Sequence, residues 1–405
     1  MESSEVTVEV LAQSESRTEF ASERLKAMAM ARKPGALMPT IRSLRQELGI
    51  SNSTLNAALT LLERQGILTR RQGSGIFVAE NINQPHLLLI CSQDILLEFG
   101  ASPFWRKLIE LSRQRAASQG EHLSLHFAHT EGTTEAPESA LHPTLVELIE
   151  SKSVQGVLTK GLPHTLTRWI ESHGIPVVAF AGPAKYMVSA TSPDLIYQGV
   201  HALAQTGCHR LSLVTPINSN NIYGADFLRQ QSLFQAALSA HGLIEATNPA
   251  LSPPTDRLKN QSTGRDVYWG VTQGFEWAMQ WFGADSEPAT RPDGVISTDD
   301  MLAQGILMAL HRLGITPGRG VQIATHSNRD SPVLLGWQDQ IFRIEYDPGE
   351  IVQLLFETLE ILMSGGKPEE RLAHRPTEYI NGYFGPEYMF KASPTLIPPA
   401  EIPSP

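Results

Sequence analysis

Small polar side chains gather at one point of the sequence, where they could bond to the edges of DNA bases. Residues Ser51, Asn52, Ser53, Thr54 and Asn56 stand almost side by side. A carboxamide has both donors and an acceptor, and an Asn side chain can form two hydrogen bonds with the edge of adenine. We therefore expect these residues to contact DNA if one exposed surface holds them together.

Helical spacing of the apolar residues around this cluster provides such a surface. Thr40 can cap a first helix and Gly49 can end it, after which Ser51 can cap a second helix. Two short amphipathic helices around a tight turn are the layout of a helix-turn-helix, whose second helix enters the major groove. The buried stripe of that second helix is predicted to be Leu55, Ala58, Leu59 and Leu62.

A basic hairpin is predicted to follow the second helix. Residues 67–72 and 76–78 read as strands on either side of a Gly-Ser-Gly tip. Seven Lys and Arg stand against two Glu between Arg32 and Val78, whereas the whole chain has a net charge of −10. A basic module in an acidic protein is typical of a part that meets phosphate. The further residues expected to contact DNA are Arg42, Arg70, Arg71, Gln72, Gly73 and Ser74.

The stretch 35–78 resembles the winged helix-turn-helix of the GntR family of bacterial transcription regulators. The resemblance implies an N-terminal domain that binds double-stranded operator DNA. Asn52 and Asn56 stand where the family often has Arg, and Arg45 where it usually has Ala, so base preference is not carried over. The matching pieces, in order, are Met38–Leu44, Leu48–Ser51, Thr54–Leu55 and Gly73–Val78.

Length and composition indicate at least two domains in a reducing compartment. A chain of 405 residues with 41% hydrophobic content can form more than one core. Only Cys91 and Cys208 are present, no apolar run approaches a membrane span, and the first residues are acidic and polar. We expect a cytoplasmic protein without a membrane contact. The expected divisions are a disordered segment 1–17, a winged domain 18–80, a linker 81–85, an effector-binding domain 86–392 and a Pro-rich tail 393–405.

Strands and helices alternate from residue 86 onward. Repeated β-α units with apolar strands predict an α/β fold with parallel sheets covered on both faces. Two successive series of similar size predict two lobes with a cleft between them. Strands are expected at 86–91, 121–127, 154–159, 176–180, 210–214, 294–297 and 321–325, and helices at 104–118, 141–151, 164–172, 195–205, 225–240, 268–282 and 301–313.

Residues 86–381 resemble the effector-binding domain of the LacI family and the related periplasmic sugar-binding proteins. The resemblance implies a two-lobed fold, a small-molecule effector in the interlobe cleft, and a homodimer. Thr325-His326-Ser327-Asn328 replaces the family's Gly-Tyr-Asp-Asp, so the identity of the ligand is not carried over. The matching pieces are Pro103-Phe104, Asp194 with Gly199, Gly207–Leu211, Ile296–Gly305 and Ile344–Asp347.

Six residues are candidates for effector binding. Asp299 would follow a parallel strand, where open α/β sheets bind ligands, but it could instead cap the next helix. Phe104 and Trp105 could stack on a ligand such as a sugar, or could be core aromatics. The resemblance adds Arg229 after a loop, and Tyr346 and Asp347 near the hinge.

No catalytic set, cofactor motif or metal-ligand set is predicted. His122 and His126 would share one face of a strand but His129 would not, and no Cys or carboxylate stands beside them in the sequence. Surface or core histidines explain this group better than a metal site. An aminotransferase-like enzyme, which some GntR-type proteins contain, would need a longer chain and a Schiff-base lysine.

These patterns lead to the hypothesis of a ligand-responsive transcription regulator, most simply a repressor, that binds operator DNA and senses a small molecule. The alternative is a solute-binding protein without a regulatory role, which the missing signal peptide and the winged module disfavour. The sequence leaves open the effector, the operator, and whether the ligand releases or promotes DNA binding.

Overall fold

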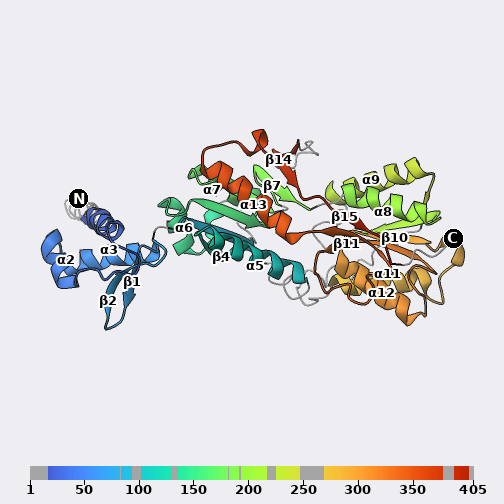
Figure 1. Cartoon of the computed structure of the whole chain (residues 1–405), viewed down its shortest axis with the longest axis horizontal. Helices are drawn as coiled ribbons and strands as arrows, with labels where there is room; N and C mark the ends of the chain where they lie inside the picture. Colours follow the sequence, from blue (N-terminus) through green and yellow to red (C-terminus); the bar gives the residue numbers. More distant parts are fainter. Residues whose placement is uncertain are drawn as a thin grey trace, which may run out of the picture.

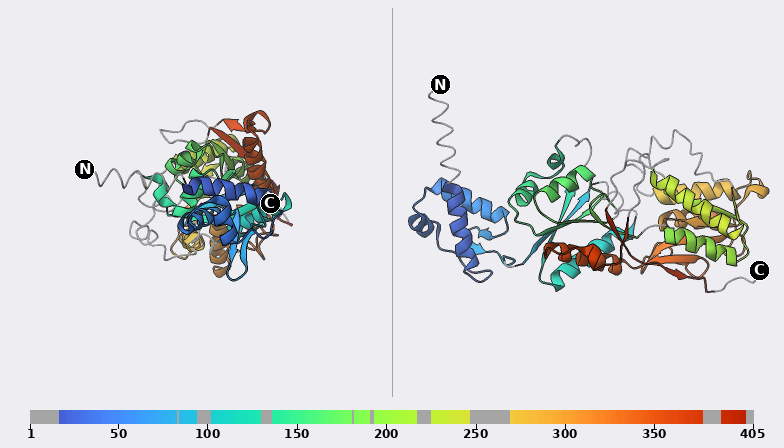
Figure 2. Two further views of the ribbon diagram at one scale, coloured as in Figure 1. Left: turned by 90° about the vertical axis from the view of Figure 1, so that its left-hand side faces the viewer. Right: turned by 90° about the horizontal axis from the view of Figure 1, so that it is seen from above.

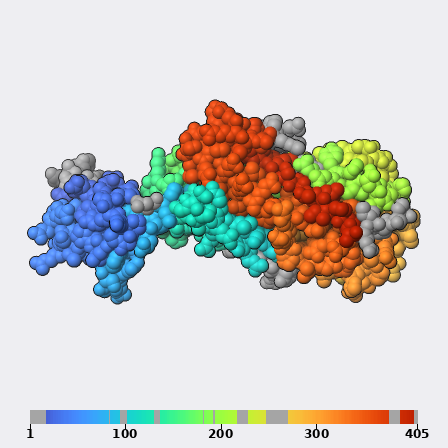
Figure 3. Space-filling model, viewed as in Figure 1, coloured from blue at the N-terminus to red at the C-terminus, as the bar shows by residue number. Residues whose placement is uncertain are grey.

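The chain forms three bodies in a row, as Figure 1 and the view from above in Figure 2 show. The head, residues 17–78, lies at one end beside the first α/β lobe, and the second α/β lobe lies beyond it; the surface in Figure 3 narrows where the head meets the first lobe. The computed structural model describes residues 17–82, 84–93, 102–129, 136–180, 182–190, 193–216, 225–246, 269–376 and 387–400. The segment 1–16, expected to be disordered, lies outside these ranges.

The helix α2 (Ile41–Leu48) begins and ends, and α3 (Asn52–Arg64) begins, at the predicted capping residues. The Thr40 hydroxyl accepts a hydrogen bond from the backbone N–H of Ser43 at 3.2 Å, and the first helix of the pair ends at Gly49, whose φ of 63° suits glycine. The helix-turn-helix prediction is confirmed. The elements of the head are a helix over residues 17–30, α2 (Ile41–Leu48), α3 (Asn52–Arg64), β1 (Leu68–Arg71) and β2 (Gly75–Val78).

One small core holds the head together. The apolar stripe of α3 packs on Leu25 of the N-terminal helix and on Leu44 of α2. The antiparallel hairpin pairs Leu68 with Val78 and adds both side chains to that core. The recognition helix therefore has one fully buried side, which fixes its other side toward solvent.

The first lobe, called the N-lobe, is a seven-stranded sheet of order β13-β14-β7-β6-β5-β3-β4. Leu87 and Leu89 of β3 face α5 and α13, and Leu88 and Ile90 face α6 and α7. Both faces are thus covered, as a parallel sheet requires. The elements are β3 (His86–Ser92), α5 (Pro103–Ser118), β4 (His122–Ala128), η1 (Pro137–Ala140), α6 (Pro143–Glu150), β5 (Gly156–Lys160), α7 (His164–Ser172), β6 (Val177–Phe180), β7 (Tyr186–Ser189), α13 (Pro348–Met363), η4 (Pro368–Glu370), β13 (Arg375–Pro376) and β14 (Tyr388–Lys391).

The second lobe, called the C-lobe, is a six-stranded sheet of order β15-β12-β11-β10-β8-β9. Ile296 of β10 packs toward α8 and α9, while Val295 packs toward α11 and α12. The elements are α8 (Pro193–Gln205), β8 (Arg210–Val214), α9 (Ala225–His241), β9 (Ile244–Glu245), α11 (Trp269–Phe282), η3 (Pro288–Thr290), β10 (Gly294–Ser297), α12 (Asp300–Arg312), β11 (Gln322–Asn328), β12 (Phe342–Tyr346) and β15 (Thr395–Ile397).

The chain passes back and forth between the lobes. It enters the C-lobe at α8, returns to the N-lobe with α13 directly after Tyr346, and crosses again from β14 to β15. Residues 393–405, expected to be a tail, contain β15, which pairs antiparallel with β12 through Arg343 and Ile397. The C-lobe therefore extends past residue 392. The prediction of two α/β lobes with parallel sheets is confirmed.

Candidate DNA-binding face and ligand cleft

Asn52 and Asn56 lie one turn apart on the exposed side of α3. Leu55 between them is fully buried, so the two carboxamides point away from the head core. Among the hydrogen bonds of the described residues, none occupies either carboxamide. Both side chains are therefore free to bond to a base edge.

The hydroxyls beside them stabilise the start of the helix. The Ser51 hydroxyl accepts from the backbone N–H of Thr54 at 3.1 Å and lies 2.8 Å from the hydroxyls of both Ser53 and Thr54. This network caps α3. The Ser51 proton can be donated to only one of the two hydroxyls, and the hydroxyl that accepts it keeps its own proton, which could be donated to a phosphate oxygen.

The tip of the hairpin presents exposed polar residues. Gly73 has a φ of 74°, and the turn closes through a 2.9 Å hydrogen bond from the N–H of Ser74 to the carbonyl of Arg71. The guanidinium of Arg71 lies over the ring of Phe77, 4.7 Å from its centroid. This cation–π contact orients the charge without neutralising it. Gln72, Gly73 and Ser74 are all exposed at the tip.

Arg70, the other basic residue of the wing, is held against α3. Its side chain bonds to Glu63 at 2.8 Å and to the Thr60 hydroxyl at 2.9 Å. Burial alone raises the pKa of Glu63, but the hydrogen bonds and charge of Arg70 outweigh it and leave that pKa below its ordinary value. Arg70 thus fixes the wing to the recognition helix, a role that its position in the sequence does not reveal.

A second exposed arginine accompanies Arg42 on α2. Arg42 and Arg45 are three residues apart and lie on neighbouring positions of the helix surface. Arg45 is not among the residues predicted to contact DNA. Its exposure beside Arg42 adds it to the cationic surface of the head.

A small cavity of about 160 Å³ lies where the two lobes meet. The start of α5 in the N-lobe forms one wall, and the residues that follow β11 in the C-lobe form the other. Cations and carboxylates line it together, as a site for a polar ligand requires. The lining residues are Pro103, Phe104, Arg106, Lys107, Glu110, Asn328, Arg329, Asp330, Ser331, Pro332 and Pro348.

Two adjacent carboxyls stand behind this cavity and have different tasks. Asp299 caps α12, because its Oδ1 accepts from the N–H of Leu302 at 2.9 Å. Asp300 is only 3% exposed, and among the described residues its Oδ2 has no hydrogen-bond partner. Burial raises the pKa of Asp300, while hydrogen bonds from Asn328 and Ser331 lower it. Burial and the neighbouring Asp300 raise the pKa of Asp299.

The structure therefore separates the carboxyl that caps α12 from the buried carboxyl of Asp300. Sequence spacing pointed to Asp299, whereas Asp300 is the carboxyl whose partners, Asn328 and Ser331, line the cavity. The signal that could have identified it is the position of Gly305: in the LacI-family pattern Val-x-Asn-Asp-x-Met-Ala-x-Gly the Gly follows the Asp by five residues, as Gly305 follows Asp300.

The hinge residues are close to this cavity but engaged with the protein. Tyr346 is buried and its ring stacks on His326 with the centroids 5.1 Å apart. Among the described residues its hydroxyl has no hydrogen-bond partner, and burial raises the pKa of Tyr346. Asp347 caps α13 through the N–H of Gly349 and forms an ion pair with Arg329. Tyr346 keeps an available hydroxyl, whereas Asp347 has a structural role.

The remaining predicted effector residues do not converge. Phe104 lines the cavity, but Trp105 turns into the N-lobe, where it packs edge-on against Phe180 beneath Lys160. Arg229 is exposed on α9 and is absent from the cavity wall. Of the aromatic pair, Phe104 alone is placed to meet a ligand in this cavity.

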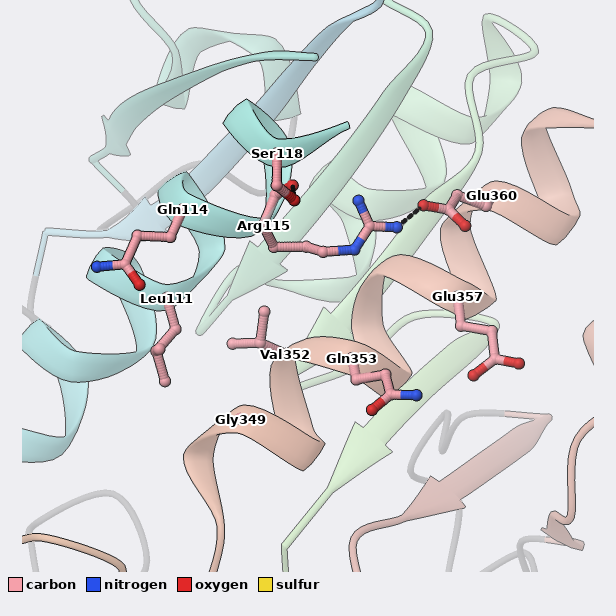
Figure 4. A pocket seen from close by; sticks show the side chains of 9 residues that line it. All are labelled: Leu111, Gln114, Arg115, Ser118, Gly349, Val352, Gln353, Glu357 and Glu360. Atoms are coloured by element: carbon pink, nitrogen blue, oxygen red, sulfur yellow. Dashed lines mark hydrogen bonds and ion pairs between the residues drawn. The ribbon is translucent and has the colours of Figure 1, made fainter. Parts of the chain in front are cut away.

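A wider groove of about 650 Å³ runs between α5 and α13 on the outside of the N-lobe. Figure 4 shows Leu111 and Val352 at its floor and Arg115 reaching across from α5 to an ion pair with Glu360 of α13. The groove joins two helices of one lobe and does not reach the interlobe cavity.

His122 and His126 lie on one face of β4, as the alternation predicts, together with Ser124. Within the described ranges, no group of three or more His, Cys, Asp and Glu side chains is arranged to hold a metal ion. Over the same residues, the helices are too short or too polar to span a membrane.

Two parts of the chain match known protein families. Residues 18–78 match the sequence profile of the bacterial regulatory proteins of the gntR family, and residues 200–382 match that of the periplasmic binding protein-like domain. An HTH-type transcriptional regulator of Mycobacterium tuberculosis is 38% identical over 88 residues. That match covers 20% of this chain and 32% of the relative, so the chain spans about a third of it.

The fold is similar to that of LacI-type repressor structures. The lac repressor dimer bound to operator and an anti-inducer has a TM-score of 0.53 at 14% identity, covering 78% of this chain and 92% of that chain. A LacI-family regulatory protein of Chloroflexus aggregans has a TM-score of 0.52 at 14% identity, covering 78% of this chain and 98% of that chain. The complex of the transcriptional regulator CelR with cellobiose has a TM-score of 0.50 at 16% identity, covering 86% of this chain and 90% of that chain. The chain thus combines an N-terminal domain that matches the gntR-family profile with a periplasmic-binding-protein-like domain whose two-lobed fold is similar to that of LacI-type repressor structures.

Proposed function

We propose that the chain is a transcription regulator, in simplest form a repressor, that binds operator DNA with the head and senses a small molecule between its lobes. The observation that carries the proposal is the free carboxamide pair of Asn52 and Asn56 on a capped recognition helix, within residues that match the gntR profile. A solute-binding protein would have no use for this surface. The DNA contacts proposed are the exposed residues of α2, α3 and the wing tip.

The proposed effector is a polar, hydroxyl-rich molecule such as a carbohydrate. Asp300 supplies a buried acceptor, Tyr346 a hydroxyl and Phe104 an apolar face. A hydroxyl bonded to a charged group contributes about 1.5–3 kcal/mol, enough to favour closure of the lobes. The cellobiose complex of CelR, which has a similar fold, supports this class of ligand.

We further propose that the protein acts in the cytoplasm as a homodimer with two heads. One recognition helix covers only a few base pairs, so specific binding needs two half-sites. Lobe closure would change the spacing of the heads and hence operator affinity, because the effector binds two states differently. The functional divisions proposed are a DNA-binding domain 18–80, a linker 81–85 and a sensor from residue 86 onward.

The test is selection of operator DNA by the intact protein from fragments of the genome that encodes it. We expect enrichment of a few sites with two related half-sites, and loss of this enrichment in Asn52→Ala/Asn56→Ala. The control variant is Arg319→Gln, which removes an exposed cation of the C-lobe; this lobe lies at the opposite end of the molecule from the head (Figure 1). Enrichment that is equal in all three proteins, or absent from all, would refute the proposal.

A further inference from the structure

A second cavity, of about 410 Å³, lies between the head and the N-lobe. Its volume is within the range of small-molecule sites, and it is separate from the interlobe cavity. The head contributes the first helix and the end of α3, and the N-lobe contributes β3, β4 and the end of α6. The lining residues are Lys26, Met30, Arg64, Gln65, Gly66, Ile67, Asn81, Ile82, Gln84, His86, His122, Ser124, His126, Thr144, Leu148, Lys152, Ser153 and Gln155.

The charge of this wall is of one sign. Lys26 and Arg64 come from the head and Lys152 from the N-lobe, and no Asp or Glu is among the described lining residues. Glu147 lies just outside and pairs with Arg64 at 3.2 Å, which links the two bodies and neutralises one of the three cations. In a chain of net charge −10, such a wall favours an anion.

Three imidazoles form the floor of the cavity. The parallel pairing of β3 and β4 sets His86 beside His122, with the ring centroids 4.8 Å apart. The Ser124 hydroxyl lies 2.8 Å from Nε2 of His86 and 3.0 Å from Nε2 of His126. Burial lowers the pKa of His86 to about 4, with further lowering by the two other imidazoles. Neutral imidazoles carry N–H donors, and no carboxylate among the described lining residues competes for them.

The backbone of Lys152 belongs to the turn that ends α6. Its φ of 53° is left-handed, and the N–H groups of Lys152 and Ser153 donate to the carbonyls of Ile149 and Leu148, both at 3.0 Å. This hydrogen-bonded turn fixes the backbone of Lys152 in the cavity wall.

We propose that this cavity is a binding site for a phosphate-type oxyanion, free or esterified, that bridges Lys26 and Arg64 of the head to Lys152 and the histidine floor of the N-lobe. Neutral imidazoles and ammonium groups both donate to phosphate oxygens, and such charge-assisted bonds are strong. The bound anion holds the head in one orientation on the sensor. Binding of the anion does not depend on the proposed function. The effect of this binding on regulation rests on the proposed function.

The test of binding is calorimetric titration of the intact protein at constant ionic strength with inorganic phosphate and, separately, with glucose 6-phosphate. We expect one saturable site per chain. Lys152→Asn, which tolerates the left-handed backbone, and His122→Gln should each weaken binding about tenfold or more. Arg319→Gln, which removes an exposed cation elsewhere, should bind as the wild type does. Tighter binding of glucose 6-phosphate than of inorganic phosphate would indicate a phosphorylated metabolite as the ligand. Equal affinity for the two would indicate free phosphate.

Absence of saturable binding of both probes, or equal affinity in all four proteins, would overturn the site. The bridge is tested by hydrogen exchange of residues 79–82 and 84–85, which should slow with phosphate in the wild type and not in Lys152→Asn. Unchanged exchange in the wild type with phosphate bound would overturn the bridge. Without phosphate, Lys152→Asn and the wild type should select the same DNA. A negative result for the anion site is therefore distinct from a negative result for the proposed DNA-binding function.

Discussion

Asn56 is the residue that we propose reads the bases of the operator most directly. Its carboxamide is exposed, unoccupied and one turn from Asn52. Asn56→Ala should cost about 1–3 kcal/mol on the selected operator and little on random DNA, because a base contact discriminates whereas a phosphate contact does not. Binding titrations at one fixed salt concentration measure both values. Arg71→Ala is the matched control and should weaken binding to both DNAs alike; the same behaviour in Asn56→Ala would mean that this residue does not read bases.

Asp300 makes stability depend on pH in a direction opposite to that of most carboxyls. Its folded-state pKa is raised by burial, so the ionised form is favoured more in the unfolded chain. The resulting destabilisation is absent at low pH and develops as the pH rises through the raised pKa. Asp300→Asn should therefore be more stable than the wild type at pH 8, and the difference should vanish below about pH 4.

Urea unfolding of both proteins at several pH values measures this difference. Asp299→Asn should shift stability in the same direction, because the pKa of Asp299 is raised as well and Asn can still accept the hydrogen bond from the N–H of Leu302. If the free energies of unfolding of Asp300→Asn and the wild type differ by the same amount at every pH, the pKa of Asp300 is not shifted in the folded protein. The same variant should lose response to a hydroxyl-rich effector by about tenfold or more if Asp300 holds the ligand.

At the level of elements, α11 and α12 pack through glycines in close backbone contact. A Cβ on Gly305 would lie 1.9 Å from the carbonyl oxygen of Val271, and one on Gly274 would lie 2.0 Å from that of Leu302. Backbone atoms cannot move aside as a side chain can. Gly305→Ala should therefore force the helices apart and destabilise the C-lobe by about 1–3 kcal/mol, measured as a lower free energy of unfolding.

Met308→Ala, on the exposed side of the same helix, is the control and should change stability little. Gly305→Ala that is as stable as the wild type would mean that the two helices adjust at no cost. Gly305 was noted in the sequence only as part of a motif, because the partner helix that requires it lies thirty residues earlier in the chain.

Local signals explain which elements could be predicted. The caps at Thr40 and Ser51 and the apolar stripe of α3 act within a few residues, so the head was predictable in detail. Strands β9, β13 and β15 were not, because two or three residues show no alternation and their pairing depends on distant partners. The candidate site depends more on packing: the spacing near Asp299 allows two alignments, and only the folded chain shows which carboxyl caps α12 and which is buried.

For the whole molecule, two heads per functional unit are expected. At micromolar concentration the intact protein should sediment with about twice the chain mass of 44.5 kDa. A footprint on the selected operator should cover two half-sites about one helical turn or a multiple of it apart. A monomeric mass together with protection of a single half-site would contradict the homodimer.

The order of the crossings also has a consequence for synthesis of the chain on the ribosome. The head is complete once residue 78 has emerged, whereas the N-lobe sheet lacks β14 until residue 391 is made. The nascent chain therefore exposes a folded DNA-binding unit long before the lobe beside it can close its core. A product arrested in the C-lobe would carry that unit on an incomplete sensor, so regulated protein arises only from chains translated almost to the end.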